Sequence, residues 1–269
     1  MKIIKTKNKL YKIINKEKKI GFVPTMGGIH LGHLSLIKKS IKECNKTVIS
    51  IFINKPQFNK KSDYHNYPRS LKKDLKSLKK FKSLIIYIPK SNQIYTKEKN
   101  KNIILPAFAK TLCGKHRPGH FKAVVDVIDR FIKIINPSRI YFGEKDMQQL
   151  KIVENYVKNK YKKIKIVHCK TVREVNGIAY STRNYLLKKN EKEIASKIYT
   201  LIKKNKKNIL NQKISLKIIK KDIINFGVKK IDYLKIIDLN KVIKLFKKIR
   251  KNKIFIAYYL RKVRLIDNI

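Results

Sequence analysis

The stretch from residue 21 to residue 35, GFVPTMGGIHLGHLS, constrains this chain most. It reads as a buried strand that ends at Pro24, because proline cannot donate a hydrogen bond to a strand ladder. Two glycines then permit a tight turn, and an apolar period that begins at Leu34 predicts a helix. Free backbone N–H groups and the imidazoles of His30 and His33 are therefore expected to face one spot that suits an anion.

The alternative interpretation of this stretch is an ordinary strand–helix turn that happens to carry two histidines. The H-x-G-H spacing alone does not decide between the two. The strand before it and the helix after it favour an anion site, because the motif then stands in the structural context that it needs.

The chain of 269 residues carries a formal net charge of +51, from 68 Lys and Arg against 17 Asp and Glu. Such a balance normally suggests a nucleic-acid partner. The basic residues are spread along the chain instead of forming one block, and abundant Lys, Ile and Asn without Trp are typical of an AT-rich coding sequence. We therefore expect no specific nucleic-acid binding, only attraction to polyanions at low salt.

The three cysteines, Cys44, Cys113 and Cys169, lie far apart and form neither a CxxC pair nor a metal-ligand spacing. They are expected to be reduced thiols. Residues 1–10 lack the apolar core of a signal peptide, and no apolar run approaches the roughly 18 residues that span a bilayer. The sequence therefore predicts a soluble cytoplasmic protein without a membrane partner.

Short runs rich in β-branched residues alternate with periodic helices as far as residue 170. This alternation predicts an α/β domain with a doubly wound, mostly parallel sheet over residues 1–171. Asn176-Gly177 then stands between two alternating runs, which indicates a hairpin with a two-residue turn, and a small α+β domain is expected over residues 172–269. Loops are expected at residues 59–66, 89–102 and 112–120, and a helix from Tyr67 onward.

Three further polar stretches stand where ligands are expected. Gln57 follows the buried run TVISIFIN, residues 143–146 (GEKD) follow a later strand, and residues 181–184 (STRN) follow the hairpin. An open α/β sheet binds ligands at the carboxyl ends of its strands, so the first two stretches are expected beside the histidines. The third is expected where the second domain covers the site.

Each of these stretches also has an ordinary interpretation. Gln57 can be an exposed loop amide, and Asp146 can be a helix cap beside an exposed Lys145, instead of a ligand for a metal or a ribose hydroxyl. The loop LCGKHRPGH at residues 112–120 either closes over a phosphate-bearing ligand or is a solvated basic loop.

Two histidines, one lysine and one arginine in these stretches would form a cradle for a polyphosphate. The chain has no Walker A motif, no G-x-G-x-x-G that opens a helix and no Ser–His–Asp order. This argues against P-loop phosphoryl transfer, hydride transfer and acyl hydrolysis. The cradle suits in-line attack on the α-phosphate of ATP with departure of pyrophosphate, where positioning and charge neutralisation supply most of the rate.

Seven segments in matching order make the chain resemble the pantothenate synthetase (pantoate–β-alanine ligase) family of the H-I-G-H nucleotidyltransferases. They are PTMGGIHLGH, SIFINKPQF, YPRSLKKDL, RPGHF, YFGEKDMQQL, REVNGIAYSTRN and RLIDN. The resemblance covers nearly the whole chain and implies a Rossmann-like domain, a smaller C-terminal lid domain and a homodimer. It implies that pantoate attacks the α-phosphate of Mg·ATP, and that β-alanine then attacks the pantoyl adenylate, which yields pantothenate and AMP.

The resemblance implies that four residues carry the chemistry. His33 is the expected general acid, His30 and His33 stabilise phosphate charge, and Lys145 and Arg183 contact the phosphates. The expected ATP-binding residues are Met26, Gly27, Gly28, Ile29, His30, Leu31, Gly32, His33, Gly143, Glu144, Lys145, Asp146, Val172, Tyr180, Ser181, Thr182 and Arg183.

Gln57 and Gln149 are expected to hold pantoate, with Gln57 also near β-alanine, and Mg²⁺ is expected to arrive with ATP. Three positions depart from the family pattern. Pro56 is shifted by one residue, which points to a less rigid pantoate loop. Ala123 and Asp126 stand where glycine and threonine are usual, and the carboxylate raises the question of an altered pocket wall or dimer contact.

Two alternative functions remain open at this point. One is a related nucleotidyltransferase that transfers AMP to a phosphate ester, which the neutral amides of Gln57 and Gln149 disfavour. The other is a basic RNA-binding protein, which requires cations interleaved with exposed aromatic side chains. The aromatic residues of this chain mostly fall on apolar faces.

Overall fold

The structure, a computed structural model, describes residues 1–95, 103–242 and 252–269. Six strands of the described chain form a parallel sheet in the order β1-β4-β3-β2-β5-β6. The order reverses between β2 and β5, and ligands bind at such a reversal. The strands are β1 (Lys2–Ile4), β2 (Ile20–Thr25), β3 (Lys46–Ile51), β4 (Leu84–Tyr87), β5 (Arg139–Gly143) and β6 (Lys165–Cys169).

Helices cover both faces of this sheet, which is why its central strands read as continuous apolar runs. Phe22 and Val48 lie in the core under α1, α7 and α8, whereas Val23 and Ile49 lie in the core under α2 and α4. Successive side chains of a strand point to opposite faces, so each strand supplies both cores. The helices are α1 (Lys7–Ile14), α2 (Leu31–Glu43), α4 (Leu71–Leu78), α7 (His120–Ile135) and α8 (Met147–Lys160).

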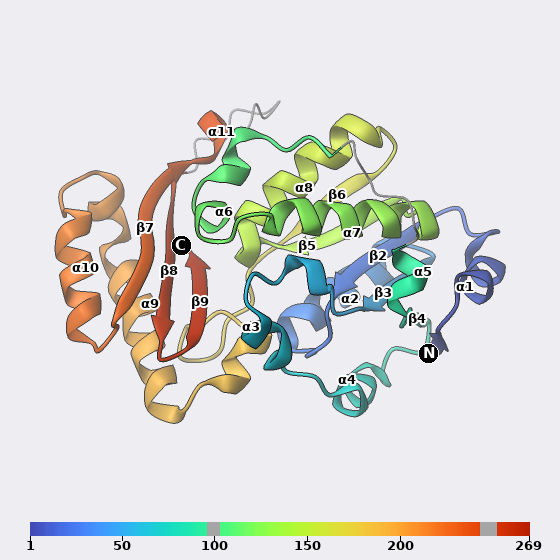
Figure 1. The fold of residues 1–269 in the computed structure, drawn as a ribbon, viewed down its shortest axis with the longest axis horizontal. Coiled ribbons are helices and arrows are strands. Elements are labelled where there is room, and N and C mark those ends of the chain that lie inside the picture. The colour runs from blue at the N-terminus through green and yellow to red at the C-terminus, as the bar shows by residue number, and fades with distance from the viewer. Residues whose placement is uncertain (96–102, 243–251) are drawn as a thin grey trace.

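A three-stranded antiparallel sheet forms the other end of the molecule, at the left of Figure 1. Its strands β7 (Lys230–Asp238), β8 (Asn252–Leu260) and β9 (Val263–Asn268) follow the helices α9 (Lys189–Leu210) and α10 (Leu216–Asn225). Ile254 and Ile256 of β8 pack into the core with α9 and α10. Phe255 and Ala257 belong to the core of the parallel sheet. Alternate side chains of β8 therefore pack into two different cores, and this strand connects the two parts of the molecule.

The predicted α/β architecture, with a Rossmann-like parallel sheet and a smaller C-terminal α+β part, is confirmed. The division into residues 1–171 and 172–269 stays a prediction. No described helix combines the length and the apolar composition that a membrane crossing requires. The remaining short elements are α3 (Lys61–His65), α5 (Ser91–Ile94), α6 (Cys113–His116), α11 (Leu239–Val242) and the 3₁₀ turns η1 (Lys55–Gln57), η2 (Ala107–Lys110), η3 (Glu144–Asp146) and η4 (Thr182–Leu186).

Several loop predictions are wrong in part. The three expected loops contain the short helices α3, α5 and α6, and residues 96–102 of the second loop lie outside the described residues. One-turn helices leave little periodicity for a sequence pattern to show. The helix expected from Tyr67 begins at Leu71, and β9 was not predicted at all.

The hairpin at Asn176-Gly177 is confirmed, but its loop has three residues instead of two. Arg173 pairs with Ala179, and Gly177 N–H donates to the carbonyl oxygen of Glu174 at 2.8 Å. Gly177 has φ +87°, whereas Asn176 does not adopt the positive φ that a two-residue turn of type I′ requires. A Cβ on residue 177 would also lie 2.2 Å from the Tyr199 ring, so only glycine fits.

We predict that Ile49→Ala destabilises the protein by about 2–5 kcal/mol, because Ile49 is fully buried in the central strand β3 and its loss leaves a cavity. The free energy of unfolding in urea measures this. Ile224→Ala is the matched control, since Ile224 on α10 is 57% exposed, and it should shift stability by at most about 0.5 kcal/mol. Equal losses in both variants would contradict the assignment of Ile49 to the core.

Candidate active site

A pocket of about 1060 Å³ lies at the carboxyl edge of the parallel sheet and reaches the three-stranded sheet. The four predicted stretches meet there, three from the ends of β2, β3 and β5 and the fourth from Ser181 and the first residues of η4. The predicted site residues that line it are Met26, His30, Gly32, His33, Gln57, Gly143, Lys145, Asp146, Gln149, Val172, Tyr180, Ser181, Thr182 and Arg183.

Five predicted ATP-binding residues do not line this pocket. Gly27, Gly28 and Ile29 are buried behind it, Leu31 is 51% exposed, and Glu144 follows Gly143 in the 3₁₀ turn η3. Gly27, Gly28 and Ile29 form the turn before the histidines. They support the pocket from behind and do not line it.

The glycine turn after β2 is held from within the protein. Gly27 and Gly28 adopt left-handed φ values of +81° and +62°. The N–H groups of Gly28 and Ile29 donate to the two carboxylate oxygens of Asp74 at 3.0 and 2.7 Å, and Gly27 N–H donates to the Thr25 hydroxyl at 3.2 Å. The N–H groups of these three turn residues are therefore not free for an anion, contrary to the expectation for this part of the motif. Asp74 of α4 occupies them, because a buried N–H without an acceptor would cost about 1–3 kcal/mol.

Thr182 ties the segment after the hairpin to the same turn. Its hydroxyl donates to the Gly28 carbonyl oxygen at 3.1 Å, across 154 positions of sequence. A Cβ on residue 28 would lie 2.2 Å from the Thr182 methyl carbon. Glycine is needed there for close approach as well as for its positive φ.

His30 and His33 stack with ring centroids 3.9 Å apart. Their Nδ1 atoms are buried and have no hydrogen-bond partner among the described residues. Burial, with the charge of Lys145, lowers the pKa of His33 to about 4 although Asp146 opposes the shift. Burial, His33 and Lys145 lower the pKa of His30 to about 2. Both imidazoles are therefore neutral at pH 7 in the protein alone.

Gln57 is 9% exposed and held from four sides, so it is not an exposed loop amide. Its Oε1 accepts from Asn54 Nδ2 at 3.0 Å, and its Nε2 lies 3.0 Å from Met26 Sδ. Its backbone carbonyl oxygen accepts from His120 Nδ1 at 2.8 Å and from Arg117 at 3.1 Å. These contacts support the loop despite the shifted proline.

Two other departures from the family pattern stay outside the pocket lining. The Asp126 carboxylate pairs with Arg130 one turn further along α7, at 2.9 Å. Ala123 contributes its carbonyl oxygen, which accepts from Asn54 Nδ2 at 3.2 Å. The Asp126 carboxylate therefore does not form part of the pocket wall.

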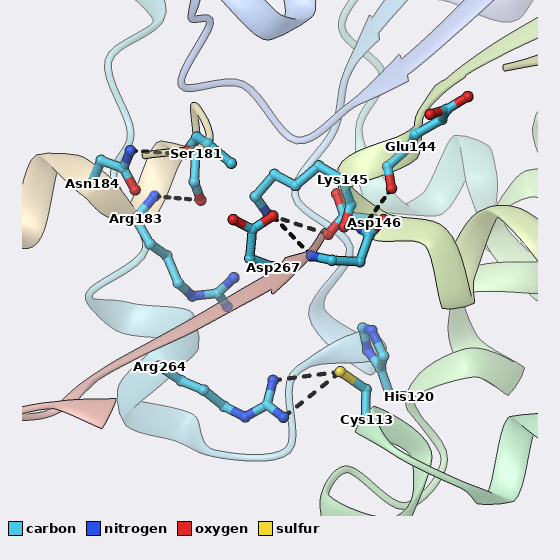
Figure 2. A network of polar contacts seen from close by, with 12 residues as sticks. Cys113, His120, Glu144, Lys145, Asp146, Ser181, Arg183, Asn184, Arg264 and Asp267 are labelled. Atoms are coloured by element: carbon cyan, nitrogen blue, oxygen red, sulfur yellow. Dashed lines mark hydrogen bonds and ion pairs between the residues drawn. The ribbon is translucent and has the colours of Figure 1, made fainter. Parts of the chain in front are cut away.

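Asn268 of β9 holds the GEKD turn in place. Its Nδ2 donates to the carbonyl oxygens of Glu144 and Lys145, both at 2.8 Å, and it is 3% exposed. The Asp146 side chain makes no capping bond to α8 but lies 3.3 Å from Lys145 Nζ, whose side chain is only 18% exposed. The interpretation of this turn as a plain helix cap with an exposed lysine is therefore wrong. Figure 2 shows this turn and Asp267 of β9 side by side.

Arg183 reaches across the pocket to α3. It donates to both carboxylate oxygens of Asp63 at 3.1 and 2.8 Å, and its guanidinium lies 5.7 Å from the centre of the Tyr67 ring. The segment 59–66, expected as a plain loop, thus provides the acidic partner of a predicted phosphate-binding residue. In the same view Arg264 of β9 points toward Cys113, and His120 lies beside that thiol (Figure 2).

Sequence reasoning missed Asp74, Asp63 and Asn268. Each acts on a partner 46, 120 or 124 positions away, and none carries a local pattern that announces this. Among the described residues, no group of three or more His, Cys, Asp or Glu side chains could hold a metal ion. Of the carboxylates that line the pocket, Asp63 pairs with Arg183 and Asp267 pairs with Arg173, whereas Asp146 lies beside Lys145. Such a lining suits a cation that arrives already bound to phosphates.

We predict that Asp74→Asn destabilises the protein by about 1–3 kcal/mol, because an amide turns an N–H toward the N–H of Gly28 or Ile29. Chemical denaturation measures the loss. Glu193→Gln, an exposed neutralisation on α9, is the matched control and should leave stability within about 0.5 kcal/mol. Two variants with the stability of the parent would refute the bracing role of Asp74.

We also predict a pH dependence of stability from His33. Its pKa in the folded protein, about 4, is below the ordinary 6.5, so the unfolded chain takes up the proton first. The stability is full above pH 6.5 and is lost as pH falls toward 4, by about 1–2 kcal/mol between pH 7 and pH 5. Unfolding curves of His33→Gln should show a smaller decrease than the parent, and the exposed-histidine control His65→Gln should not. A His33→Gln protein with the parent's pH dependence would contradict this.

Comparisons with known proteins identify the family of this chain. The family model of pantoate–β-alanine ligase matches residues 2–269. A pantothenate synthetase of Clostridium botulinum is 39% identical over the whole chain and 98% of the relative, and one of Fervidobacterium nodosum is 37% identical over the same shares.

Two solved structures are similar over the whole chain. The pantoate–β-alanine ligase of Francisella tularensis, complexed with β-γ ATP and β-alanine, has a TM-score of 0.82 and 35% identity and is covered to 97%. A pantothenate synthetase of Thermus thermophilus has a TM-score of 0.88 and 30% identity and is covered to 99%. Sequence and fold thus match over the full length, and the chain belongs to the pantoate–β-alanine ligase family.

Proposed function

We propose that this pocket condenses pantoate with β-alanine at the expense of ATP, through a pantoyl-adenylate intermediate, and releases AMP and pyrophosphate. One observation carries the assignment to these residues: His30, His33, Lys145 and Arg183 line the same pocket as two neutral amides, Gln57 and Gln149. The whole-length family match and the ATP and β-alanine of the Francisella tularensis structure support the reaction.

In the first step, a pantoate carboxylate oxygen attacks the α-phosphorus of Mg·ATP, and the bond to the pyrophosphate oxygen breaks. Lys145 and Arg183 neutralise charge on the phosphates. His30 and His33, neutral in the protein alone, donate hydrogen bonds, and the phosphates raise the pKa of both imidazoles. His33 is the proposed general acid, and its main contribution is charge stabilisation, since pyrophosphate leaves with little need of a proton.

Arg183 must exchange partners for this step. Its guanidinium pairs with Asp63, and both side chains are partly exposed, at 25% and 36%. A pair of this kind contributes roughly 0–1 kcal/mol, so a polyphosphate with several charges displaces the carboxylate at little cost. Nucleotide binding would then release α3 from the segment that follows the hairpin.

In the second step, the uncharged amine of β-alanine attacks the acyl carbon of pantoyl adenylate. A C–N bond forms, the C–O bond to AMP breaks, and the amine loses a proton. The proposed role of Gln57 and Gln149 is to hold the hydroxyl and carboxyl groups of pantoate, because neutral amides both donate and accept hydrogen bonds. Gln57, fixed by Asn54 and His120, would also direct the incoming amine.

Three further assignments belong to this proposal. Mg²⁺ enters with ATP, and Asp146 is the carboxylate placed to meet it. A homodimer follows from the resemblance to the family. A reducing cytoplasm suits the free thiols of Cys44, Cys113 and Cys169.

The proposed function predicts ATP–pyrophosphate exchange that requires pantoate, measured at moderate salt to suppress non-specific attraction of ATP to the basic surface. His33→Ala should lower the exchange rate by about 100-fold or more, the usual effect of losing one donor to a developing charge. The control His65→Ala removes a histidine outside the pocket lining and should exchange like the parent. Added β-alanine should release AMP. Folded protein that exchanges without pantoate, or not at all, would refute the carboxylate substrate.

A further inference from the structure

Arg117 is a half-buried cation of the pocket wall, and no carboxylate of the described residues pairs with it. Its hydrogen bonds within the described part of the chain go to Gln57 and His120. One terminal nitrogen donates to the Gln57 carbonyl oxygen at 3.1 Å, and the other lies 3.0 Å from His120 Nε2. A guanidinium has five N–H donors, so most of the hydrogen-bonding capacity of Arg117 is left for a ligand.

The two neighbouring arginines have acidic partners. Arg183 pairs with Asp63 at 2.8 Å, and Arg264 pairs with Asp232 at 2.7 Å. Burial, together with the charges of Arg183 and Arg264, lowers the pKa of Arg117 to about 10. Arg117 therefore remains charged at neutral pH. Asp63, which pairs with Arg183, acts on Arg117 only from a distance, and within the described ranges Arg117 is the arginine of this cluster without an ion pair of its own.

His120 fixes the orientation of the Arg117 guanidinium. The His120 Nδ1–H donates to the Gln57 carbonyl oxygen at 2.8 Å, which leaves the lone pair of Nε2 for Arg117. Burial and the charge of Arg117 keep the pKa of His120 well below its ordinary value, so the ring stays neutral and this arrangement persists. A guanidinium held in one plane presents parallel N–H groups that fit a carboxylate.

The reaction involves three kinds of anion, and two of them are already accounted for. The phosphates of ATP are met by the histidines, Lys145 and Arg183. The carboxylate of pantoate is the nucleophile, and it must stay at the α-phosphorus without a strong ion pair that would reduce its reactivity. The carboxylate of β-alanine is neither attacked nor attacking. It needs a fixed anchor beside Gln57, and Arg117 contacts Gln57.

We propose that Arg117 binds the carboxylate of β-alanine and selects ω-amino carboxylates over amines without an acid group. The proposal rests on the proposed ligase function of the pocket. It makes Arg117 a specificity-determining residue for the second step, with no part in the first, and it assigns His120 as the residue that positions Arg117.

The test separates the two half-reactions of Arg117→Gln. We expect the KM for β-alanine to rise about 10- to 100-fold, as the loss of hydrogen bonds to a charged group implies. Pantoate-dependent ATP–pyrophosphate exchange should persist with the parent's KM for pantoate. Trapping of the adenylate by hydroxylamine, a nucleophile without a carboxylate, should proceed at the parent's rate.

Two further variants sharpen this test. Arg117→Lys keeps the charge and can still reach the Gln57 carbonyl but loses the planar fork, so it should show a smaller increase in the KM for β-alanine. Arg139→Gln is the matched control, since Arg139 starts β5 at the opposite edge of the sheet and pairs with Glu43 at 2.8 Å. It should leave all these constants unchanged.

An unchanged KM for β-alanine in Arg117→Gln would overturn the proposal. So would an equal weakening of pantoate, β-alanine and hydroxylamine reactions, because Arg117 would then act only through Gln57. Failure of the parent protein to exchange with pantoate would instead refute the underlying ligase function, which keeps the two hypotheses distinguishable.

Discussion

The glycine turn between β2 and α2 is the constraint on which the pocket depends. Its left-handed backbone turns three N–H groups away from any helix or sheet partner, and buried N–H groups need acceptors. Asp74 and Thr25 supply them, and Thr182 binds the carbonyl of Gly28 from the other side. The turn is thus fixed before any ligand arrives. An anion must be bound by the side chains of His30, Lys145 and their neighbours instead of by the turn itself.

The electrostatics of the pocket follow from this arrangement. The two stacked imidazoles, whose Nδ1 atoms have no hydrogen-bond partner among the described residues, are kept neutral by burial, and Lys145 Nζ lies 3.3 Å from the Asp146 carboxylate. Neutral donors tolerate each other at close range where two charged histidines would not. A polyphosphate brings negative charge to the site. This charge raises the pKa of the imidazoles and makes their N–H groups stronger hydrogen-bond donors. The low dielectric that disfavours charged histidines in the protein alone then strengthens their contacts to phosphate.

Much of this site could be predicted from sequence, because each of the four stretches is a local pattern in which a strand, a glycine or proline and a polar group follow one another. The carboxyl ends of the strands in a parallel sheet lie at the same edge. Local patterns at residues 30–33, 57 and 143–146 were therefore sufficient to predict that these groups lie close together. The supports were not predictable in this way. Asp74 lies inside an ordinary amphipathic helix, and Asn268 lies in a short strand whose pattern gives no sign that its amide caps a turn 123 and 124 positions away. Contacts between distant segments require the fold first.

The small number of acidic residues limits which basic residues of this chain can form ion pairs. With only 17 acidic residues against 68 basic ones, ion pairs are limited by the number of carboxylates. The buried carboxylates serve the fold: Asp74 braces the glycine turn, Asp129 accepts from Tyr156, Tyr161 and Lys160, and Glu191 binds Arg261. In such a chain an arginine left without a carboxylate is ordinary on the surface, where water solvates it. In a pocket wall it is costly, because desolvation of a guanidinium needs compensation. In our proposal the carboxylate of β-alanine provides that compensation at Arg117. The basic residues on the surface attract any anion, whereas Arg117 in the pocket wall selects a substrate with a carboxylate.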